Sequence, residues 1–476
     1  MEELGREAVS KNLVNLERYR NYFLIGIGGA GMSAIAIVLA GMGFNVCGSD
    51  IKESHYIDIL RSEGISVFIG HRKDNIKGAD VVIYSSAIPE TNVEIVAARE
   101  MGIPVYARSD ILASILNSRK GIAVTGTHGK TTTTSMISLM LRGLGLDPTI
   151  IIGGELNELG SNARYGEGEY VVAEACESDG SFLKYSPYIS VVTNIEDDHL
   201  DFYHSYENLR RSFLEFLGNT KHGGIIVLNG DEVEFDKKSE IGFKNLSNVR
   251  MIYYGLSNRN NVWAENIEFS SYGSTYDLCI KEKEAISRIK VKLNVPGIHN
   301  IKNSLAALSV CYGIGLNVEE AARILRFFTG VRRRFEKRGE KKGALFFDDY
   351  AHHPSEVRAT LEAASRMDKR RLIAIFQPHR YTRLKSLYRK FGACFDFCDI
   401  LIVTDVYGAG EEPLPGVNGK LLIDSLIDCG FNRRLVYIPS LKDVSHYLED
   451  NIREGDLVLV MGAGDVTRVT EEFLRS

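Results

Sequence analysis

Short apolar runs alternate with longer helix-length segments along most of the chain. Residues 22–27 (YFLIGI) form an apolar run ending in glycine, residues 32–43 have the length of a helix, and residues 45–49 are apolar again. This order predicts a strand, a turn, a helix and a second, parallel strand. The same pattern starts again at residues 121–125 (GIAVT), which precede a predicted helix over residues 131–142.

Further apolar runs extend this alternation to the end of the chain. They predict strands at 81–85, 104–106, 170–173, 189–193, 224–228, 345–347, 372–376, 400–404, 436–438 and 457–461. Residues 258–291 alternate polar and apolar positions and predict a small β-rich patch, and residues 301–314 predict a helix with an alanine-rich face. Three groups of β/α alternation predict three α/β domains with largely parallel sheets. The expected domains are residues 1–117, 118–330 and 331–476.

Composition and charge describe an ordinary soluble protein. The 476 residues carry 57 basic and 62 acidic side chains, a net charge of −5, which argues against generic binding to nucleic acid or anionic membranes. The seven cysteines are scattered without a C-x-x-C pair, so neither a disulfide framework nor a zinc knuckle is expected. The N-terminal segment (MEELGREAVSKNLVNLERYR) lacks the apolar stretch of a signal peptide, so we expect a cytoplasmic protein.

One uncharged stretch has the length of a membrane span. The 29 residues between Arg20 and Asp50 include seven glycines, four of them between positions 26 and 31, which would weaken a lone spanning helix. A strand, a glycine turn and a buried helix account for this stretch better.

The glycine turn itself has the form of a dinucleotide-binding motif. Residues 26–31 (GIGGAG) satisfy G-x-G-x-x-G, and such glycines let the backbone approach a pyrophosphate at the start of a helix. Because NAD and UDP-sugars both carry pyrophosphate and ribose, the motif leaves both open, as well as a tight turn without a ligand. The candidate contacts are Gly26, Gly28, Gly29 and Gly31, Asp50 at the end of the next strand, and Ser85 and Ser86 at the end of a later one.

The second glycine turn, residues 126–132 (GTHGKTT), is typical of a phosphate-binding loop. Its backbone amides are expected to surround the β-phosphate, Lys130 to reach the β- and γ-phosphate oxygens, and Thr131 to bind Mg²⁺. The standard loop has a glycine five residues before Gly129, where this chain has Val124.

Acidic residues follow two of the central strands. Glu174, Glu177 and Asp179 come after the strand at 170–173 and are well placed to hold the metal of a bound nucleotide. His199 lies among aspartates after the strand at 189–193, which indicates a second metal or a phosphate contact. The alternative interpretations are a solvated acidic loop for the three acids and an isolated histidine for His199.

Four further groups of polar residues lie between residues 300 and 383. Asn300 and Asn303 either face one pocket or cap a helix, and one of Arg332–Arg334 could clamp a transferring phosphoryl group. Asp349, in DDYAHHP, could touch a ribose or base. Arg380 and Arg383, in QPHRYTR, are spaced to form a fork for a small carboxylate.

Taken in order, GIGGAGM, GTHGKTTT, EACESD, TNIEDDH, GIHNIKN, RRRF, DDYAHHP and QPHRYTR resemble the Mur ligases of peptidoglycan synthesis, and within them the alanine-adding branch. The resemblance covers residues 22–461. It implies an N-terminal Rossmann-like domain for a UDP-sugar, a central P-loop-type ATPase α/β domain, and a C-terminal Rossmann-like α/β domain that closes over the site. It also accounts for Val124, because these ligases use a shortened G-T-x-G-K-T loop.

The implied reaction joins L-alanine to the carboxylate of UDP-N-acetylmuramate. ATP first phosphorylates that carboxylate, and the products are UDP-N-acetylmuramoyl-L-alanine, ADP and phosphate. The resemblance implies ATP and Mg²⁺ as cofactors, a cytoplasmic monomer or homodimer, and no nucleic-acid partner or stable membrane insertion. A related ligase that adds a peptide to the same UDP-sugar remains the alternative.

The resemblance also implies residue roles. The implied catalytic residues are Lys130, Glu174, His199 and Arg334; the metal ligands are Thr131, Glu174 and His199; the ATP contacts are Gly126, Thr127, His128, Gly129, Lys130, Thr131, Thr132, Asn300, Asn303 and Asp349; the UDP-sugar contacts are the N-terminal candidates given above; and the alanine contacts are His379, Arg380 and Arg383. Cys176 departs from the pattern, since relatives often have an acid there. No modified lysine is expected, because the segment after Tyr206 offers Arg210 and Arg211 instead.

Three other classes of protein explain less of the sequence. A dehydrogenase leaves residues 126–132 unused, and an ATPase switch leaves the N-terminal domain unused. Folylpolyglutamate synthetases share the central domain but lack the UDP-sugar domain.

Overall fold

The computed structural model describes residues 14–232, 248–270, 273–283 and 285–475. The first 13 residues of the segment examined for a signal peptide therefore lie outside the described residues. Contacts divide the chain into two compact units. One contains residues 1–265, 277–291 and 302–328, and the other contains residues 266–276, 292–301 and 329–476.

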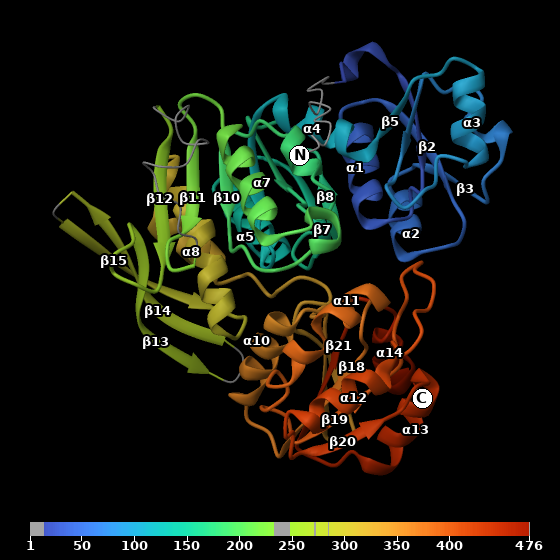
Figure 1. Ribbon diagram of the computed structural model, residues 1–476. Helices are drawn as coiled ribbons and strands as arrows, with labels where there is room; N and C mark the ends of the chain where they lie inside the picture. The colour runs from blue at the N-terminus through green and yellow to red at the C-terminus, as the bar shows by residue number, and fades with distance from the viewer. Residues whose placement is uncertain (1–13, 233–247, 271–272, 284, 476) are drawn as a thin grey trace, which may run out of the picture. The chain divides into compact units, whose positions relative to one another are not determined.

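The first sheet has five strands in the order β3-β2-β1-β4-β5, all parallel (blue in Figure 1). Its strands are β1 (Asn21–Ile25), β2 (Asn45–Asp50), β3 (Ser66–Ile69), β4 (Val81–Tyr84) and β5 (Val105–Ala107). The helices are α1 (Ala30–Gly41), α2 (His55–Ser62), α3 (Val93–Glu100) and α4 (Arg108–Asn117), with short 3-10 turns η1 (Leu16–Arg18) and η2 (Lys73–Ile76). The uncharged stretch is thus a strand, a turn, a buried helix and a strand, as predicted. No helix in the described part of the chain has both the length and the hydropathy required to cross a bilayer.

The second sheet has ten strands in the order β15-β14-β13-β12-β11-β10-β6-β9-β7-β8. Its strands are β6 (Lys120–Thr125), β7 (Thr149–Leu156), β8 (Ser161–Arg164), β9 (Tyr170–Glu174), β10 (Ile189–Val192), β11 (Ile225–Asn229), β12 (Arg250–Gly255), β13 (Val262–Ser270), β14 (Gly273–Glu282) and β15 (Ala285–Leu293). The helices are α5 (Lys130–Gly143), α6 (Leu200–Tyr203), α7 (Tyr206–Gly218), α8 (Ile298–Gly313) and α9 (Val318–Leu325), with the turn η3 (Ser181–Lys184). The predicted β-rich patch is the set β13 to β15.

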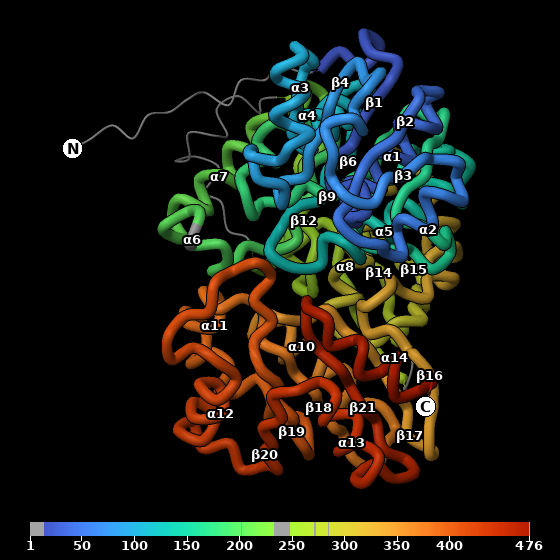
Figure 2. Tube along the Cα trace, turned by 90° about the vertical axis from the view of Figure 1, so that its right-hand side faces the viewer, coloured from blue at the N-terminus to red at the C-terminus, as the bar shows by residue number. Residues whose placement is uncertain are grey.

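The third sheet has six strands in the order β16-β17-β21-β18-β19-β20, and only β16 is antiparallel (orange to red in Figure 2). Its strands are β16 (Glu336–Lys341), β17 (Ala344–Asp349), β18 (Arg371–Phe376), β19 (Ile400–Val403), β20 (Arg434–Tyr437) and β21 (Asp456–Met461). The helices are α10 (Pro354–Ser365), α11 (Tyr381–Leu387), α12 (Gly419–Asp428), α13 (Leu441–Asn451) and α14 (Thr467–Arg475), with the turn η5 (Tyr388–Phe391).

The central strands are buried because helices cover both faces of a parallel sheet. Every residue of β21 is buried, although its sequence (DLVLVM) begins with an acid. The acid, Asp456, is satisfied by two bonds from the Arg371 guanidinium. The glycine turns after β1 and β6 lie at the carboxyl ends of buried parallel strands. Ligands bind at this end of the strands in such sheets.

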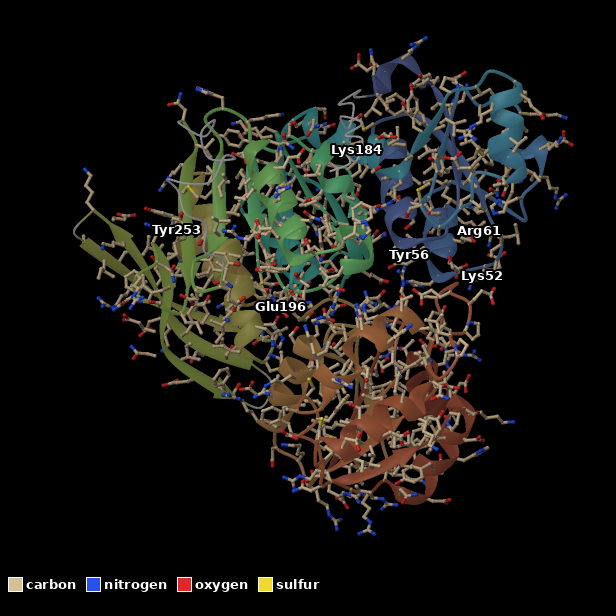
Figure 3. All side chains as sticks on the ribbon, viewed as in Figure 1. Lys52, Tyr56, Arg61, Lys184, Glu196 and Tyr253 are labelled. Carbon is tan, nitrogen blue, oxygen red and sulfur yellow. The ribbon has the colours of Figure 1, made fainter. Side chains whose placement is uncertain are left out.

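Helix α1 also packs on β7 and β8, in the same compact unit. A Cβ at Gly41 would lie 2.4 Å from Tyr165, so the helix approaches β8 as closely as a glycine allows. Asn162 donates hydrogen bonds to the Ala30 carbonyl at 2.5 Å and to Ser33 Oγ at 3.0 Å. Lys184, labelled in Figure 3, makes an ion pair of 2.6 Å with Asp110 at the start of α4.

Candidate functional site

The loop after β6 reaches α5 through Gly126 and Gly129. Their φ angles are +131° and +81°, conformations that residues with a side chain rarely adopt. Space is excluded as well, since a Cβ at Gly126 would lie 2.1 Å from Thr193 Oγ1, and one at Gly129 would lie 2.4 Å from Asn303 Oδ1. Both glycines are therefore required by the shape of the loop, and Asn303 lies directly against it.

The residues after β10 hold this loop in place. The side-chain Oδ1 of Asn194 accepts a hydrogen bond from the His128 amide at 2.9 Å, and its backbone carbonyl accepts one from the Thr127 amide at 3.1 Å. The Thr127 hydroxyl accepts the backbone amide of Glu196, a residue labelled in Figure 3, at 2.8 Å. Two of the amides expected to face a phosphate are thus engaged with Asn194. The amides on the first turn of α5 have no partner within the helix, so they are the remaining backbone candidates for a phosphate. Thr132 lies half-buried on that turn.

Lys130 is the first residue of α5, and its side chain folds back over the loop. Its Nζ donates to the carbonyls of Gly126 at 2.5 Å and Thr127 at 3.0 Å, and to Glu177 Oε1 at 2.9 Å. Burial is the largest single influence and opposes the charged form, but the charges of Glu177, Cys176 and Glu174 and the hydrogen bond to Glu177 together outweigh it and leave the pKa of Lys130 raised. The lysine therefore places a positive charge over the loop.

Thr131 and Glu174 come together beside the loop. Thr131 Oγ1 donates to Glu174 Oε2 at 3.2 Å, and Glu174 Oε1 accepts the Gly153 amide at 2.6 Å. A hydroxyl and carboxylates are the oxygen ligands that Mg²⁺ prefers. The buried Oε2 of Glu177 has no hydrogen-bond partner within the described structure. The donor set fits a magnesium ion.

His199 follows β10 in a left-handed conformation, with φ of +55°. Its Nε2 lies 3.8 Å from Glu177 Oε1 and 3.5 Å from Asp198 Oδ2. Glu177 therefore connects His199 to Lys130. Asp179, in contrast, is exposed and accepts the backbone amide of Ser181 at 3.0 Å, so its carboxylate closes a local turn.

The N-terminal glycine loop is held by Asp50 and Ser54. Asp50 Oδ2 accepts the Gly28 amide at 2.9 Å, and Ser54 Oγ donates to the Gly28 carbonyl at 3.0 Å. A Cβ at Gly28 would lie 2.9 Å from Ser54 Oγ and 3.0 Å from Asp50 Oδ2. Asp50 thus uses one oxygen to shape the loop.

The remaining candidates of this loop fall on the same edge of the sheet. A Cβ at Gly26 would lie 3.2 Å from Ser85 Cβ, because β1 and β4 are neighbours, whereas Ser86 is exposed beyond the strand. A Cβ at Gly31 would lie 2.8 Å from a guanidinium nitrogen of Arg108. The sequence motifs did not indicate Arg108, since it lies far along the chain at the start of α4.

A buried carboxylate beside this edge was also missed. Glu94 has no exposed surface, and it accepts hydrogen bonds from Ser49 at 2.6 Å, His71 at 2.8 Å, Asn75 at 2.6 Å and the Arg72 amide at 3.2 Å. It therefore fixes the loop after β3 next to the end of β2. No motif marks it, because its partners are scattered through the sequence.

In the C-terminal unit, Arg334 lies beside Asp349. Arg334 lies over the Tyr350 ring at 4.9 Å, and its guanidinium is 3.8 Å from Glu356. Burial raises the pKa of Asp349 to about 6, although Arg334 and two backbone amides favour its ionised form. Asp349 uses both oxygens on the amides of Phe335 and Ala351. It therefore shapes this segment, in addition to any contact with a nucleotide.

Arg333 and Asn300 have structural partners of their own. Arg333 donates to the carbonyls of Gly462 at 2.7 Å and Gly464 at 2.9 Å, which leaves Arg334 as the better candidate for a phosphoryl clamp. Asn300 donates to the Pro296 carbonyl at 2.7 Å on the first turn of α8, the helix that also carries Asn303.

His379 and Arg383 lie together after β18. Arg383 approaches His379 Nδ1 at 3.1 Å, and since a guanidinium only donates, Nδ1 is the acceptor of a neutral ring. Burial, followed by His352 and the nearby arginines, lowers the pKa of His379 to about 3, and its ring stacks on Tyr407. Arg380 is exposed and has φ of +66°. One arm of the expected two-arginine fork is thus directed at His379.

These features define a nucleotide-binding enzyme with three α/β sheets. Three family models match the chain: "Mur ligase family, catalytic domain" over residues 21–120, "Mur ligase middle domain" over 124–311, and "Mur ligase, glutamate ligase domain" over 333–464. The chain belongs to the Mur ligase family.

Curated relatives match almost end to end. A UDP-N-acetylmuramate–L-alanine ligase from Desulforamulus reducens is 44% identical over 466 residues, covering 95% of this chain and 96% of the relative. One from Rubrobacter xylanophilus is 45% identical over 453 residues, covering 95% and 98%. Among solved structures, the UDP-N-acetylmuramate-alanine ligase MurC from Thermotoga maritima is 29% identical, with a TM-score of 0.79 and coverage of 96% and 98%.

Proposed function

We propose that this chain ligates L-alanine to the carboxylate of UDP-N-acetylmuramate at the expense of ATP. The products are UDP-N-acetylmuramoyl-L-alanine, ADP and phosphate, and the step belongs to peptidoglycan precursor synthesis. One observation carries the proposal: a glycine loop in which Lys130 pairs with Glu177 and Thr131 with Glu174 lies in a chain 40–45% identical, over nearly its full length, to proteins named for this activity.

We assign one task to each domain. Residues 1–117 would bind the UDP-sugar through Gly26, Gly28, Gly29, Gly31, Asp50, Ser85 and Ser86. Residues 118–330 would bind ATP through the loop at 126–132, with Asn300 and Asn303 completing the pocket. Residues 331–476 would bind the amino acid through His379, Arg380 and Arg383, and would add Arg334 and Asp349 to the nucleotide site.

Activation of the carboxylate is the first chemical problem. A carboxylate is a poor electrophile, so its oxygen attacks the γ-phosphorus of ATP and ADP leaves. Catalysis of phosphoryl transfer rests on positioning and on neutralising the charge of the phosphates. Lys130 would supply one positive charge at the loop, and Arg334 would supply a second. Mg²⁺, held by Thr131 and Glu174 with His199 serving a second ion, would add further positive charge to the phosphates.

Amide formation is the second step. The amine of alanine attacks the acyl phosphate, and phosphate leaves. The neutral ring of His379 and the charges of Arg380 and Arg383 fit a small zwitterion, because guanidinium groups recognise carboxylates. The cytoplasm, where ATP and UDP-sugars are available, is the proposed place of action.

The test is phosphate release from Mg-ATP and UDP-N-acetylmuramate with single amino acids added in turn. We expect release with L-alanine and formation of UDP-N-acetylmuramoyl-L-alanine by mass spectrometry. Release only with a tripeptide would instead assign a peptide ligase. No release with any acceptor, in a chain that still binds ADP, would overturn the proposal.

A further inference from the structure

The phosphate-loop lysine has a carboxylate partner deep in the protein. Glu177 is 2% exposed, and its Oε1 lies 2.9 Å from Lys130 Nζ. The lysine proposed to bind the nucleotide phosphates thus already has a carboxylate partner. Three acceptors, Glu177 and the carbonyls of Gly126 and Thr127, together match the three donors of an ammonium group.

The backbone of Glu177 is fixed by two hydrogen bonds. Its backbone carbonyl accepts a hydrogen bond from the Tyr203 hydroxyl and another from the Gly180 amide at 3.0 Å. Its Oε2 is buried without a hydrogen-bond partner within the described residues, and His199 Nε2 approaches Oε1 at 3.8 Å. Lys130 has a long flexible side chain, so Lys130 is the partner that can turn away.

We infer that Glu177 is a positioning residue that occupies Lys130 in place of a phosphate and releases it only to a nucleotide that arrives with its divalent cation. This inference rests on the proposed ATP site. A nucleotide without a cation competes with Glu177 for Lys130, and its phosphates then face an uncompensated buried carboxylate. A cation held at Thr131 and Glu174, or at His199, would offset that charge.

The inference predicts that neutralising Glu177 strengthens nucleotide binding in the absence of a cation, whereas loss of a purely structural counter-ion would weaken it. If Glu177 only stabilised a buried lysine, its neutralisation would weaken nucleotide binding together with the fold. If Glu177 competes with phosphate, neutralisation frees Lys130, and the nucleotide without a cation binds more tightly. The measured quantity is therefore the ratio of ADP affinities with and without Mg²⁺.

The experiment is calorimetric titration of ADP into the full-length chain, in Mg²⁺ and in EDTA. For Glu177→Gln we expect ADP in EDTA to bind about tenfold more tightly than to wild type, and the gain from Mg²⁺ to shrink by a similar factor. Asp179→Asn is the matched control, since it removes the same charge from an exposed position of the same loop. We expect its two affinities to remain within about twofold of wild type.

Glu177→Asp keeps the charge and provides a second variant should Glu177→Gln fail to fold. Shortening the side chain by one methylene lengthens the contact with Lys130, so ADP in EDTA should bind about threefold more tightly. Unchanged or weaker binding in EDTA by a folded variant overturns the inference. Failure of the wild-type chain to bind ADP under either condition would instead refute the proposed ATP site.

Discussion

The carboxylate of Asp349 accepts the backbone amide of Phe335 at 2.8 Å and so holds the residue next to Arg334 against the end of β17. The segment bends on both sides of Arg334, since Arg333 and Phe335 have φ of +59° and +51°. The second oxygen of Asp349 accepts the Ala351 amide at 2.7 Å. One buried aspartate therefore orients the proposed phosphoryl clamp from within its own domain.

This aspartate should make stability depend on pH in an unusual direction. Burial raises its pKa to about 6 in the folded chain, against about 3.9 when unfolded. Between these values the unfolded chain has lost a proton that the folded chain retains, so this group's contribution to stability falls as the pH rises from about 4 to about 6. A shift of this size corresponds to about 3 kcal/mol at most.

We therefore expect Asp349→Asn to remove that decline. The measurement is the difference between wild-type and variant free energies of unfolding in urea, at intervals from pH 4 to pH 7. The exposed Asp396→Asn serves as the control for loss of one charge. A difference that does not change with pH would show that Asp349 titrates normally.

Removing the loop lysine should separate catalysis from substrate binding. We expect Lys130→Ala to lower phosphate release by about 10³-fold or more, because phosphoryl transfer depends on fixed positive charge. Binding of UDP-N-acetylmuramate should be nearly unchanged, since its proposed contacts lie on the first sheet. Lys120→Ala, which removes a half-exposed lysine from the start of β6, is the control. Turnover retained by Lys130→Ala would remove the phosphate-loop assignment.

Loss of the Glu94 carboxylate should destabilise the N-terminal sheet. Glu94→Ala leaves four donors without their acceptor in a fully buried site, which typically costs about 3–5 kcal/mol. Chemical denaturation measures this loss. Glu90→Ala removes an exposed carboxylate paired with Arg99 and should cost less than about 1 kcal/mol. Equal effects of the two substitutions would contradict the buried network.

Most of the fold could be predicted from the sequence, because buried parallel strands appear as short apolar runs before glycine turns. Strands β3, β7, β8, β12 and β16 were missed. β3 (SVFI) and β16 (EKRGEK) are edge strands in which exposed positions break up the apolar pattern. β7 and β8 are the last two strands of the ten-stranded sheet. Two glycines interrupt the apolar run of β7, and β8 (SNAR) is mostly polar, so neither has the apolar pattern of a buried strand.

The candidate site could be predicted where its residues are neighbours in the sequence. The loop residues from Gly126 to Thr131 are adjacent in sequence, so one motif indicates them. Asn194, Arg108 and Glu94 act through contacts that span between 45 and 77 residues of the chain, and no local pattern marks such contacts. The sequence likewise does not show which of Glu174, Glu177 and Asp179 pairs with Lys130, because that depends on which carboxylate the turn after β9 directs inward.

The contact between Arg383 and His379 leads to the last prediction. Because Arg383 approaches His379 Nδ1 at 3.1 Å while Arg380 is exposed, the two arginines should contribute differently to alanine binding. Arg380→Ala should raise the KM for alanine by at least about tenfold and leave the KM for ATP within about twofold, since it removes one charged contact to a carboxylate. Arg383→Ala should raise the KM for alanine and also lower kcat, because the histidine loses its donor. Steady-state kinetics with each substrate varied in turn measures both, and Arg389→Ala on the nearby turn η5 controls for loss of surface charge. Equal effects of Arg380→Ala on alanine and ATP would refute the alanine assignment.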